Sequence, residues 1–131
     1  MIVVDASVLA HVVGDDGDDG VRARGAIASG PGLAAPDLVD VEPVAVFRRR
    51  WLAGDLTEAR FLRAIDDLLD LPCDRYPVGQ LMRRAFELRA NVTAYDACYV
   101  ALAEALNARL LTADARLAAA PGFRCEIDLL R

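Results

Sequence analysis

Four acidic residues stand where short segments of the chain begin or end, and they are spread over its whole length. They are Asp5, Glu42, Asp96 and Asp114. A carboxylate at the end of a buried strand is costly unless hydrogen-bond donors or a cation compensate for its charge. Several carboxylates held close together also repel one another and take up protons unless a counter-charge is present. The sequence therefore predicts a fold that gathers these four side chains around a metal ion.

The chemistry of these donors indicates which metal they would hold. Ligation by oxygen alone favours Mg²⁺ or Mn²⁺ over zinc, and we interpret the single histidine, His11, as an ordinary helix residue. Mg²⁺ held by carboxylates suits the attack of water on a phosphodiester, because the cation acidifies the water and screens the developing charge. Each aspartate could instead simply be the N-cap of a helix, an alternative that stays open for Asp114 in particular.

The residue types that are absent exclude several other functions. All fifteen basic residues are arginine, whereas P-loop proteins, Schiff-base enzymes and receiver-type phosphotransfer domains need a lysine. A phosphatase of the aspartyl-phosphate type would need an aspartate two residues after Asp5, where Ser7 stands. The net charge of −5 argues against a nucleic-acid coat protein. It is compatible with a nuclease whose site is neutralised by divalent cations.

The elements that must position the acids alternate between strands and helices. Strands are expected at 2–4, 33–35, 73–76, 109–112 and 124–127, helices at 6–13, 21–29, 37–53, 57–71, 78–90, 94–107 and 115–119, and a solvated turn at 15–20. Ser7 is able to cap the first helix. The alternation predicts an α/β fold with a parallel sheet and helices on both faces. Sites in such sheets form at the carboxyl ends of strands, where Asp5 and Asp114 stand.

The bulk properties predict one globular domain, residues 1–131, large enough to bury roughly two-thirds of its unfolded surface. No apolar stretch approaches the roughly 20 residues that a membrane span requires, and no export signal is visible. The three cysteines, Cys73, Cys98 and Cys125, are odd in number and lack CxxC spacing. This pattern fits buried thiols in a reducing cytoplasm.

Four segments that contain the acids follow one another in a specific order, at 4–9, 41–49, 91–103 and 111–117. The most specific are Thr-Ala-Tyr-Asp-Ala, which contains Asp96, and Leu-Thr-Ala-Asp, which ends at Asp114. Together, over essentially the whole chain, these segments resemble the PIN-domain ribonucleases. More narrowly, they resemble the VapC toxins of bacterial type II toxin–antitoxin pairs.

The resemblance implies a three-layer α/β/α sandwich around a mainly parallel sheet. It also implies Mg²⁺-dependent cleavage of RNA, with Mn²⁺ as an alternative metal, that leaves a 5′-phosphate and a 3′-hydroxyl. Asp5 and Asp96 would be the central metal ligands, and Asp114 would bind directly or through water. Glu42 would bind a second metal or orient the attacking water.

The resemblance also implies supporting residues and partners. The hydroxyls of Ser7 and Thr112 would hold the carboxylates or waters, although a capping or strand-end role is equally open. Asn91 and Tyr95 would contact the substrate or support the site. Arg48 lies in a run of three arginines that is either an exposed helix face or a contact with RNA phosphates. The implied partners are a VapB-like antitoxin, which lies across helices beside the site, an RNA of the tRNA or rRNA class, and a second copy of the chain.

Pro43 departs from the regular helix that the family has after Glu42. A proline in a helix interior costs roughly 3 kcal/mol, but one in the first turn loses nothing, because its missing N–H would have no partner there. A helix capped by Asp40 would place Pro43 in that first turn. A helix beginning at Asp37 would be kinked and would turn Glu42 elsewhere. The second outcome would favour a different hypothesis, a catalytically silent PIN scaffold that binds a partner.

Overall fold

A computed structural model describes the whole chain, residues 1–131. Five strands and seven α-helices follow one another in the order β1 (Ile2–Val4), α1 (Ala6–Gly14), α2 (Asp18–Ala28), β2 (Leu33–Pro36), α3 (Glu42–Leu52), α4 (Glu58–Asp70), β3 (Cys73–Tyr76), α5 (Met82–Glu87), α6 (Ala94–Ala105), β4 (Arg109–Thr112), α7 (Ala115–Ala119) and β5 (Ile127–Leu129). Two short 3-10 helices, η1 (Asp37–Asp40) and η2 (Val78–Leu81), precede α3 and α5. The strands alternate with helices as the sequence predicted.

The five strands form one sheet in the order β3-β2-β1-β4-β5, and every neighbouring pair is parallel. The chain therefore builds the sheet outward from β1 to β3 and then returns to add β4 on the other side of β1. Connections leave β1 and β4 in opposite directions at this switch point, which opens a crevice at their carboxyl ends. Asp5 follows β1 and Asp114 follows β4, so both stand beside this crevice.

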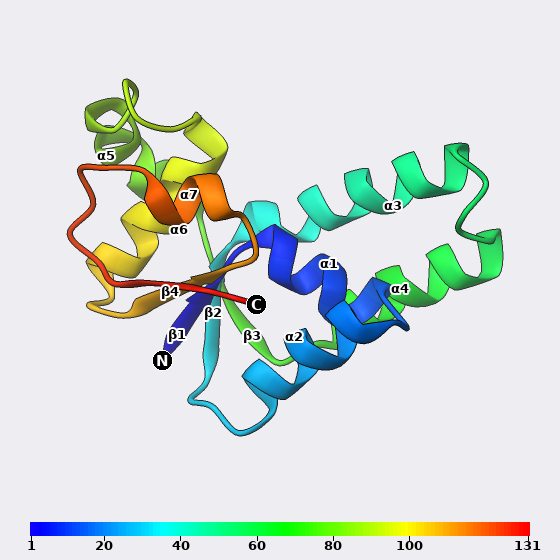
Figure 1. Ribbon diagram of the computed structural model, residues 1–131. Helices are drawn as coiled ribbons and strands as arrows, with labels where there is room; N and C mark the ends of the chain where they lie inside the picture. Colours follow the sequence, from blue (N-terminus) through cyan, green and yellow to red (C-terminus); the bar gives the residue numbers. More distant parts are fainter.

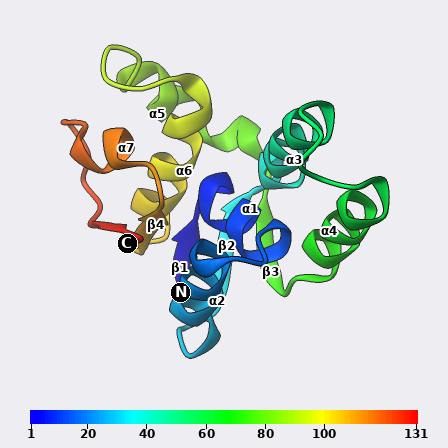
Figure 2. The same cartoon turned by 45° about the vertical axis from the view of Figure 1, so that its right-hand side comes forward.

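Helices cover both faces of the sheet, which confirms the predicted three-layer α/β/α architecture (Figures 1 and 2). On one face, α6 packs against β1, β2 and β4, and α5 packs against α6. Residues 97–103 of α6 are all buried. On the other face lies α1, which contacts α2, α3 and α4. The pair α3 and α4 extends away from the sheet as an arm (Figure 1).

Three arginines attach α2 and this arm to the carboxyl end of α1. Arg24 of α2 donates to the carbonyls of Val12 at 3.1 Å and Asp15 at 2.8 Å. Arg50 of α3 donates to Gly14 at 2.7 Å, and Arg60 of α4 donates to Val13 at 2.9 Å. The last carbonyls of a helix lack intrahelical partners and carry partial negative charge. The three guanidinium groups therefore satisfy the end of α1 and fix α2, α3 and α4 around it.

Close packing between α1 and α3 adds to this attachment. The ring of Phe47 is fully buried and occupies the space beside Gly14, where an added Cβ would lie 2.3 Å from the ring. Phe47 also meets Phe61 of α4 edge to face, with ring centroids 6.0 Å apart. Aromatic pairs of this geometry stabilise beyond the area that they bury. The position of α3, which begins at Glu42, is thus set by packing against α1 and α4.

The structure settles the question that Pro43 raised. The predicted helix at 37–53 is divided into η1 and α3, and Pro43 lies in the first turn of α3. Its missing N–H therefore costs no hydrogen bond, and Glu42 opens the helix without a kink. Asp40 does not cap α3 as expected, because its carboxylate pairs with Arg75 at 2.9 Å.

Other predicted boundaries were wrong for local reasons. The turn expected at 15–20 ends at Gly17, because α2 already begins at Asp18, where first-turn carboxylates favour a helix start. Ser7 does not cap α1; the cap is Asp5, whose carboxylate accepts from the N–H of Val8. The helix expected at 78–90 is divided into η2 and α5, and the last strand lies at Ile127–Leu129 instead of 124–127.

Two further sequence expectations concern membranes and thiols. None of the helices combines the length and the apolar character needed to cross a membrane. All three cysteines are free thiols. Only Cys98 is buried, however, while Cys73 and Cys125 are partly exposed, so the expectation of three buried thiols was wrong for two of them.

Arg60 offers a test of the attachment of the arm. We expect Arg60→Ala to lower the free energy of unfolding by about 1–3 kcal/mol, because it removes a hydrogen bond to the end of α1 and the pairing with Asp16. Arg63→Ala on the same helix is the matched control: its side chain is 75% exposed, against 21% for Arg60. The control should change the free energy by less than about 0.5 kcal/mol. Equal urea denaturation midpoints for the two variants would contradict the anchoring role.

Candidate active site

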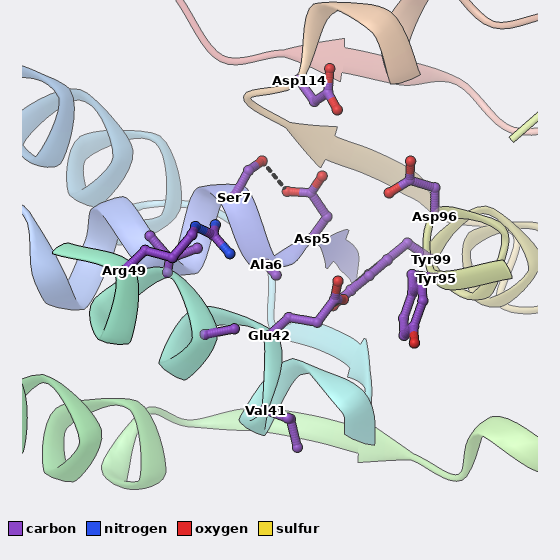
Figure 3. Close-up of a pocket in the computed structure, with 12 residues that line it drawn as sticks. Asp5, Ala6, Ser7, Val41, Glu42, Arg49, Tyr95, Asp96, Tyr99 and Asp114 are labelled. Atoms are coloured by element: carbon purple, nitrogen blue, oxygen red, sulfur yellow. Dashed lines mark hydrogen bonds between the residues drawn. The ribbon is translucent and has the colours of Figure 1, made fainter. Parts of the chain in front are cut away.

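All four acidic residues that the sequence singled out line one pocket of about 450 Å³. Asp5 comes from the end of β1, Asp114 from the turn after β4, Asp96 from the first turn of α6 and Glu42 from the first residue of α3. Figure 3 shows their carboxylates turned toward a common space between these elements. The structure therefore brings together residues that lie up to 109 positions apart, between Asp5 and Asp114.

Asp5 is held by three hydrogen bonds from two elements, α1 and β4, although its side chain is almost fully buried. One carboxylate oxygen, Oδ1, accepts from the Ser7 hydroxyl at 2.6 Å and from the N–H of Val8 at 3.2 Å. The other, Oδ2, accepts from the Thr112 hydroxyl at 2.5 Å. Each oxygen thus has a donor, and the carboxylate is fixed at the floor of the pocket.

The direction of these bonds is set by the turn after β4. The N–H of Ala113 donates to Ser7 Oγ at 3.0 Å, and the N–H of Asp114 donates to Thr112 Oγ1 at 3.0 Å. Each hydroxyl accepts from the backbone and can therefore direct its own proton to Asp5. Asp5 then accepts hydrogen bonds from both hydroxyls and donates none, which only the ionised carboxylate can do with both of its oxygens. The network therefore favours the negative charge on Asp5.

Burial and mutual repulsion oppose that charge. The pKa of Asp5 is raised, mainly by burial, while the hydrogen bonds from Ser7, Thr112 and Val8 partly offset this effect. Burial likewise raises the pKa of Glu42 and of Asp96, and the neighbouring acids raise both further. No ion pair in the structure includes Asp5, Glu42 or Asp96. The pocket thus concentrates negative charge, and of the four acids only Asp114 has an ion-pair partner, the exposed Arg116 at 3.9 Å.

The donors in this pocket fit a hard divalent cation. They are carboxylate oxygens, with hydroxyls behind them, and the pocket is lined by no histidine or cysteine. Such a set suits Mg²⁺ or Mn²⁺, which prefer oxygen ligands, and does not suit a soft metal. A bound cation would also remove the repulsion that raises the pKa of these acids. Asp5, Glu42, Asp96 and Asp114 are the residues that could hold it.

Two of the remaining predicted residues lie elsewhere. Arg48 is exposed and does not line the pocket, whereas its neighbour Arg49 does. Asn91 is also outside the pocket, and its side-chain amide donates to the carbonyl of Pro121 at 2.9 Å. Asn91 thus fixes the loop after α7. Tyr95 lies at the rim of the pocket, 64% exposed.

The pocket also contains Tyr99, which the sequence did not single out, and Arg49, which it considered only as part of the run of three arginines. Tyr99 lies one helical turn after Asp96 on α6, and Arg49 lies two turns after Glu42 on α3. Residues spaced by three, four or seven share a helix face, so this spacing was the signal that could have identified both. The hydroxyl of Tyr99 donates to Glu42 Oε1 at 2.6 Å.

A second group of ligand-type side chains lies beyond the pocket, at His11, Asp15 and Asp19. The Nδ1 atom of His11 and Oδ2 of Asp15 are 3.1 Å apart, Oδ1 of Asp15 accepts from the N–H of Gly17, and Asp19 pairs with Arg22. These carboxylates therefore already have partners. Asp5, Glu42 and Asp96 of the pocket, by contrast, pair with no basic side chain.

The chain matches the model of the PIN domain over residues 2–122. It is 42% identical over 130 residues to ribonuclease VapC1 of Mycobacterium tuberculosis, an alignment that covers 98% of this chain and 97% of the relative. A crystal structure of the sarcin–ricin loop cleaving toxin VapC20 of Mycobacterium tuberculosis has a TM-score of 0.72 at 20% identity, covering 94% of this chain and 96% of that one. VapBC2 of Rickettsia felis, bound to a promoter DNA fragment, has a TM-score of 0.67 at 14% identity and full coverage of both chains. The chain therefore belongs to the PIN-domain family and, within it, to the ribonucleases of the VapC type.

Proposed function

We propose that this protein is the toxin of a type II toxin–antitoxin pair and that it is a Mg²⁺-dependent endoribonuclease, with Mn²⁺ as an alternative metal. The observation that carries the proposal is the set of four carboxylates in one pocket at the switch point of the sheet, three of them without an ion-pair partner. A ribonuclease of the VapC type needs a means of activating water and of neutralising phosphate charge. A divalent cation held by these four carboxylates would provide both.

The residues of the pocket divide the work of hydrolysis. Asp5 and Asp96 are the central metal ligands, and Asp114 completes the set directly or through water. When bound there, the divalent cation acidifies water and neutralises charge on the phosphoryl oxygens. Glu42 keeps one carboxylate oxygen free of Tyr99, and through that oxygen it binds metal or orients the attacking water. Attack at phosphorus with departure of the 3′ oxygen leaves a 5′-phosphate and a 3′-hydroxyl.

Arg49 is the proposed contact for the RNA backbone. It lines the pocket on α3, and no ion pair or hydrogen bond in the structure includes its guanidinium. An unpaired arginine at the edge of an acidic pocket can hold a phosphate next to the scissile one. Such a contact would draw a polyanion to a protein whose net charge is −5.

The proposed partners are a VapB-like antitoxin and a second copy of the chain, acting in the cytoplasm on an RNA of the tRNA or rRNA class. The α3–α4 arm supports the antitoxin proposal because it exposes large apolar side chains. Trp51 is 47% exposed and Leu62 is 60% exposed. Exposed apolar side chains gathered on two adjacent helices are typical of a surface that another chain covers.

The first test replaces single metal ligands. We expect Asp5→Asn and Asp96→Asn each to reduce RNA cleavage by a factor on the order of 10³ and to abolish growth arrest after induction. Asp74→Asn, an exposed aspartate on β3, is the control and should cleave like the unmodified protein. Sequencing of cleaved RNA ends measures the effect and identifies the target. Unchanged cleavage by purified Asp96→Asn protein would refute the assignment.

The second test uses stability as the readout. Acids with raised pKa values bind protons more tightly in the folded state than in the unfolded state, so their charge destabilises the metal-free protein at pH 7. We expect Asp96→Asn to raise the free energy of unfolding there by about 0.5–1 kcal/mol. The difference should shrink as the pH falls through the raised pKa of the folded state and vanish well below about 3.9, the unfolded-state pKa, where the carboxylate is protonated in both states.

Added Mn²⁺ should favour the unmodified protein over the Asp96→Asn variant, the opposite of the difference expected without metal. Binding to the folded state alone raises Tm, so Mn²⁺ should stabilise the unmodified protein at pH 7 more than the Asp96→Asn variant. Thermal unfolding with and without the cation measures both effects. Equal shifts in the two proteins would exclude Asp96 as a ligand, and no shift in either would favour the silent-scaffold hypothesis.

The third test separates Arg49 from Arg48. We expect Arg49→Ala to weaken RNA binding and to reduce the slope of log K against log salt by about 0.7, the value for one phosphate contact on a single strand. Arg48→Ala should leave the slope unchanged, because Arg48 lies outside the pocket. Fluorescence anisotropy with a non-cleaved RNA in Ca²⁺ buffer provides the measurement. A loss for Arg48→Ala alone would place the RNA along the outer face of α3.

A further inference from the structure

Tyr99 is the only residue whose side chain forms a hydrogen bond between α6 and α3. Its side chain is almost fully buried, and its hydroxyl reaches the pocket, where it donates to Glu42 Oε1 at 2.6 Å. Asp96 lies one turn earlier on the same helix. Tyr99 therefore connects the helix that carries one acid with the helix that carries another (Figure 3).

Glu42 has no other polar side chain that fixes it. No ion pair includes it, and the single side-chain hydrogen bond that its carboxylate accepts comes from Tyr99. A glutamate has three side-chain torsions, and holding them in one arrangement costs conformational entropy. Pro43, the next residue in the first turn of α3, lacks an N–H that could bind the carboxylate of Glu42. The orientation of Glu42 thus depends on the Tyr99 hydroxyl.

The bond also determines how much of Glu42 remains free. The hydroxyl binds Oε1, so Oε2 is the oxygen left for another interaction in the pocket. Tyr99 is the donor of this bond, because the carboxylate can only accept. A neutral phenol next to a carboxylate fixes the direction of the bond.

We propose that Tyr99 is a positioning residue that holds Glu42 with one oxygen directed at the metal site, so that metal affinity depends on its hydroxyl. The inference rests on the proposed metal site and deepens it, since neither the acids nor their hydroxyl partners Ser7 and Thr112 account for the placement of Glu42. Groups behind metal ligands commonly change metal affinity or activity by about 10- to 100-fold when they are removed.

A merely structural role is the alternative. A buried tyrosine hydroxyl needs a hydrogen-bond partner, and Glu42 could serve only to satisfy it. In that case, loss of the hydroxyl would lower stability and leave the metal affinity unchanged. The two roles therefore differ in metal binding, which can be measured without RNA and without activity.

The experiment measures Mn²⁺ binding by calorimetry at pH 7 for the unmodified protein, Tyr99→Phe and Tyr76→Phe. Phenylalanine preserves the buried ring of Tyr99, and Tyr76 on β3 is a control outside the pocket. We expect Kd for Mn²⁺ to rise at least about tenfold in Tyr99→Phe and to stay unchanged in Tyr76→Phe. An unchanged Kd in folded Tyr99→Phe protein would overturn the proposal while leaving the ribonuclease assignment intact.

A second background shows whether Tyr99 acts through Glu42. Glu42→Ala removes the carboxylate, so adding Tyr99→Phe to it should cause no further loss of Mn²⁺ affinity. A further tenfold loss in the double variant would overturn the positioning role. If the unmodified protein bound no Mn²⁺, both this inference and the proposed function would fail. If it bound Mn²⁺ but cleaved no RNA, only the proposed function would fail.

Discussion

The buried carboxylate of Asp5 is the constraint on which the site depends. It follows β1, caps α1 and accepts hydrogen bonds from the hydroxyls of Ser7 and Thr112, which in turn accept hydrogen bonds from the backbone of the turn after β4. One negative charge thereby joins two neighbouring strands, a helix and a turn. That turn also determines where Asp114 stands. A neutral side chain at position 5 could not accept from every one of these donors, so the geometry of the pocket depends on a charge that is costly to bury.

The scaffold compensates for a site that destabilises the molecule. Burial and repulsion raise the pKa of three acids in the pocket, whereas elsewhere carboxylates are paired with arginine, as Glu104 is with Arg84 at 2.7 Å. Three guanidinium groups satisfy the carboxyl end of α1, and its Gly14 admits the ring of Phe47. Proteins often retain such unfavourable charge where function requires it. Here the same packing that supports α1 also places α3 and hence Glu42.

Much of the fold could be predicted from local patterns. The strand at 2–4 lies where it was predicted, the helix predicted at 57–71 is α4, and Pro43 lies in a first turn, one of the two outcomes that the sequence allowed. The errors lie where tertiary partners replaced a local preference. Asp40 was expected to cap a helix, but Arg75 from a distant strand pairs with it. Ser7 could cap α1 or bind a carboxylate, and its hydroxyl binds the carboxylate of Asp5. Neither partner is visible in a window of local sequence.

The sequence by itself predicted which side chains could hold a metal and in what order they occur, because the four acids stand in ordered segments that resemble one family. It also identified the alternation of strands and helices that makes the sheet parallel. Only the tertiary structure decided that β4 lies beside β1, which brings Asp114 to Asp5. It alone decided that α3 turns Arg49 rather than Arg48 toward the pocket, and that Tyr99 reaches Glu42. The physical reason is that strand order and helix rotation are fixed by packing between segments far apart in the chain, which no local pattern of residues records.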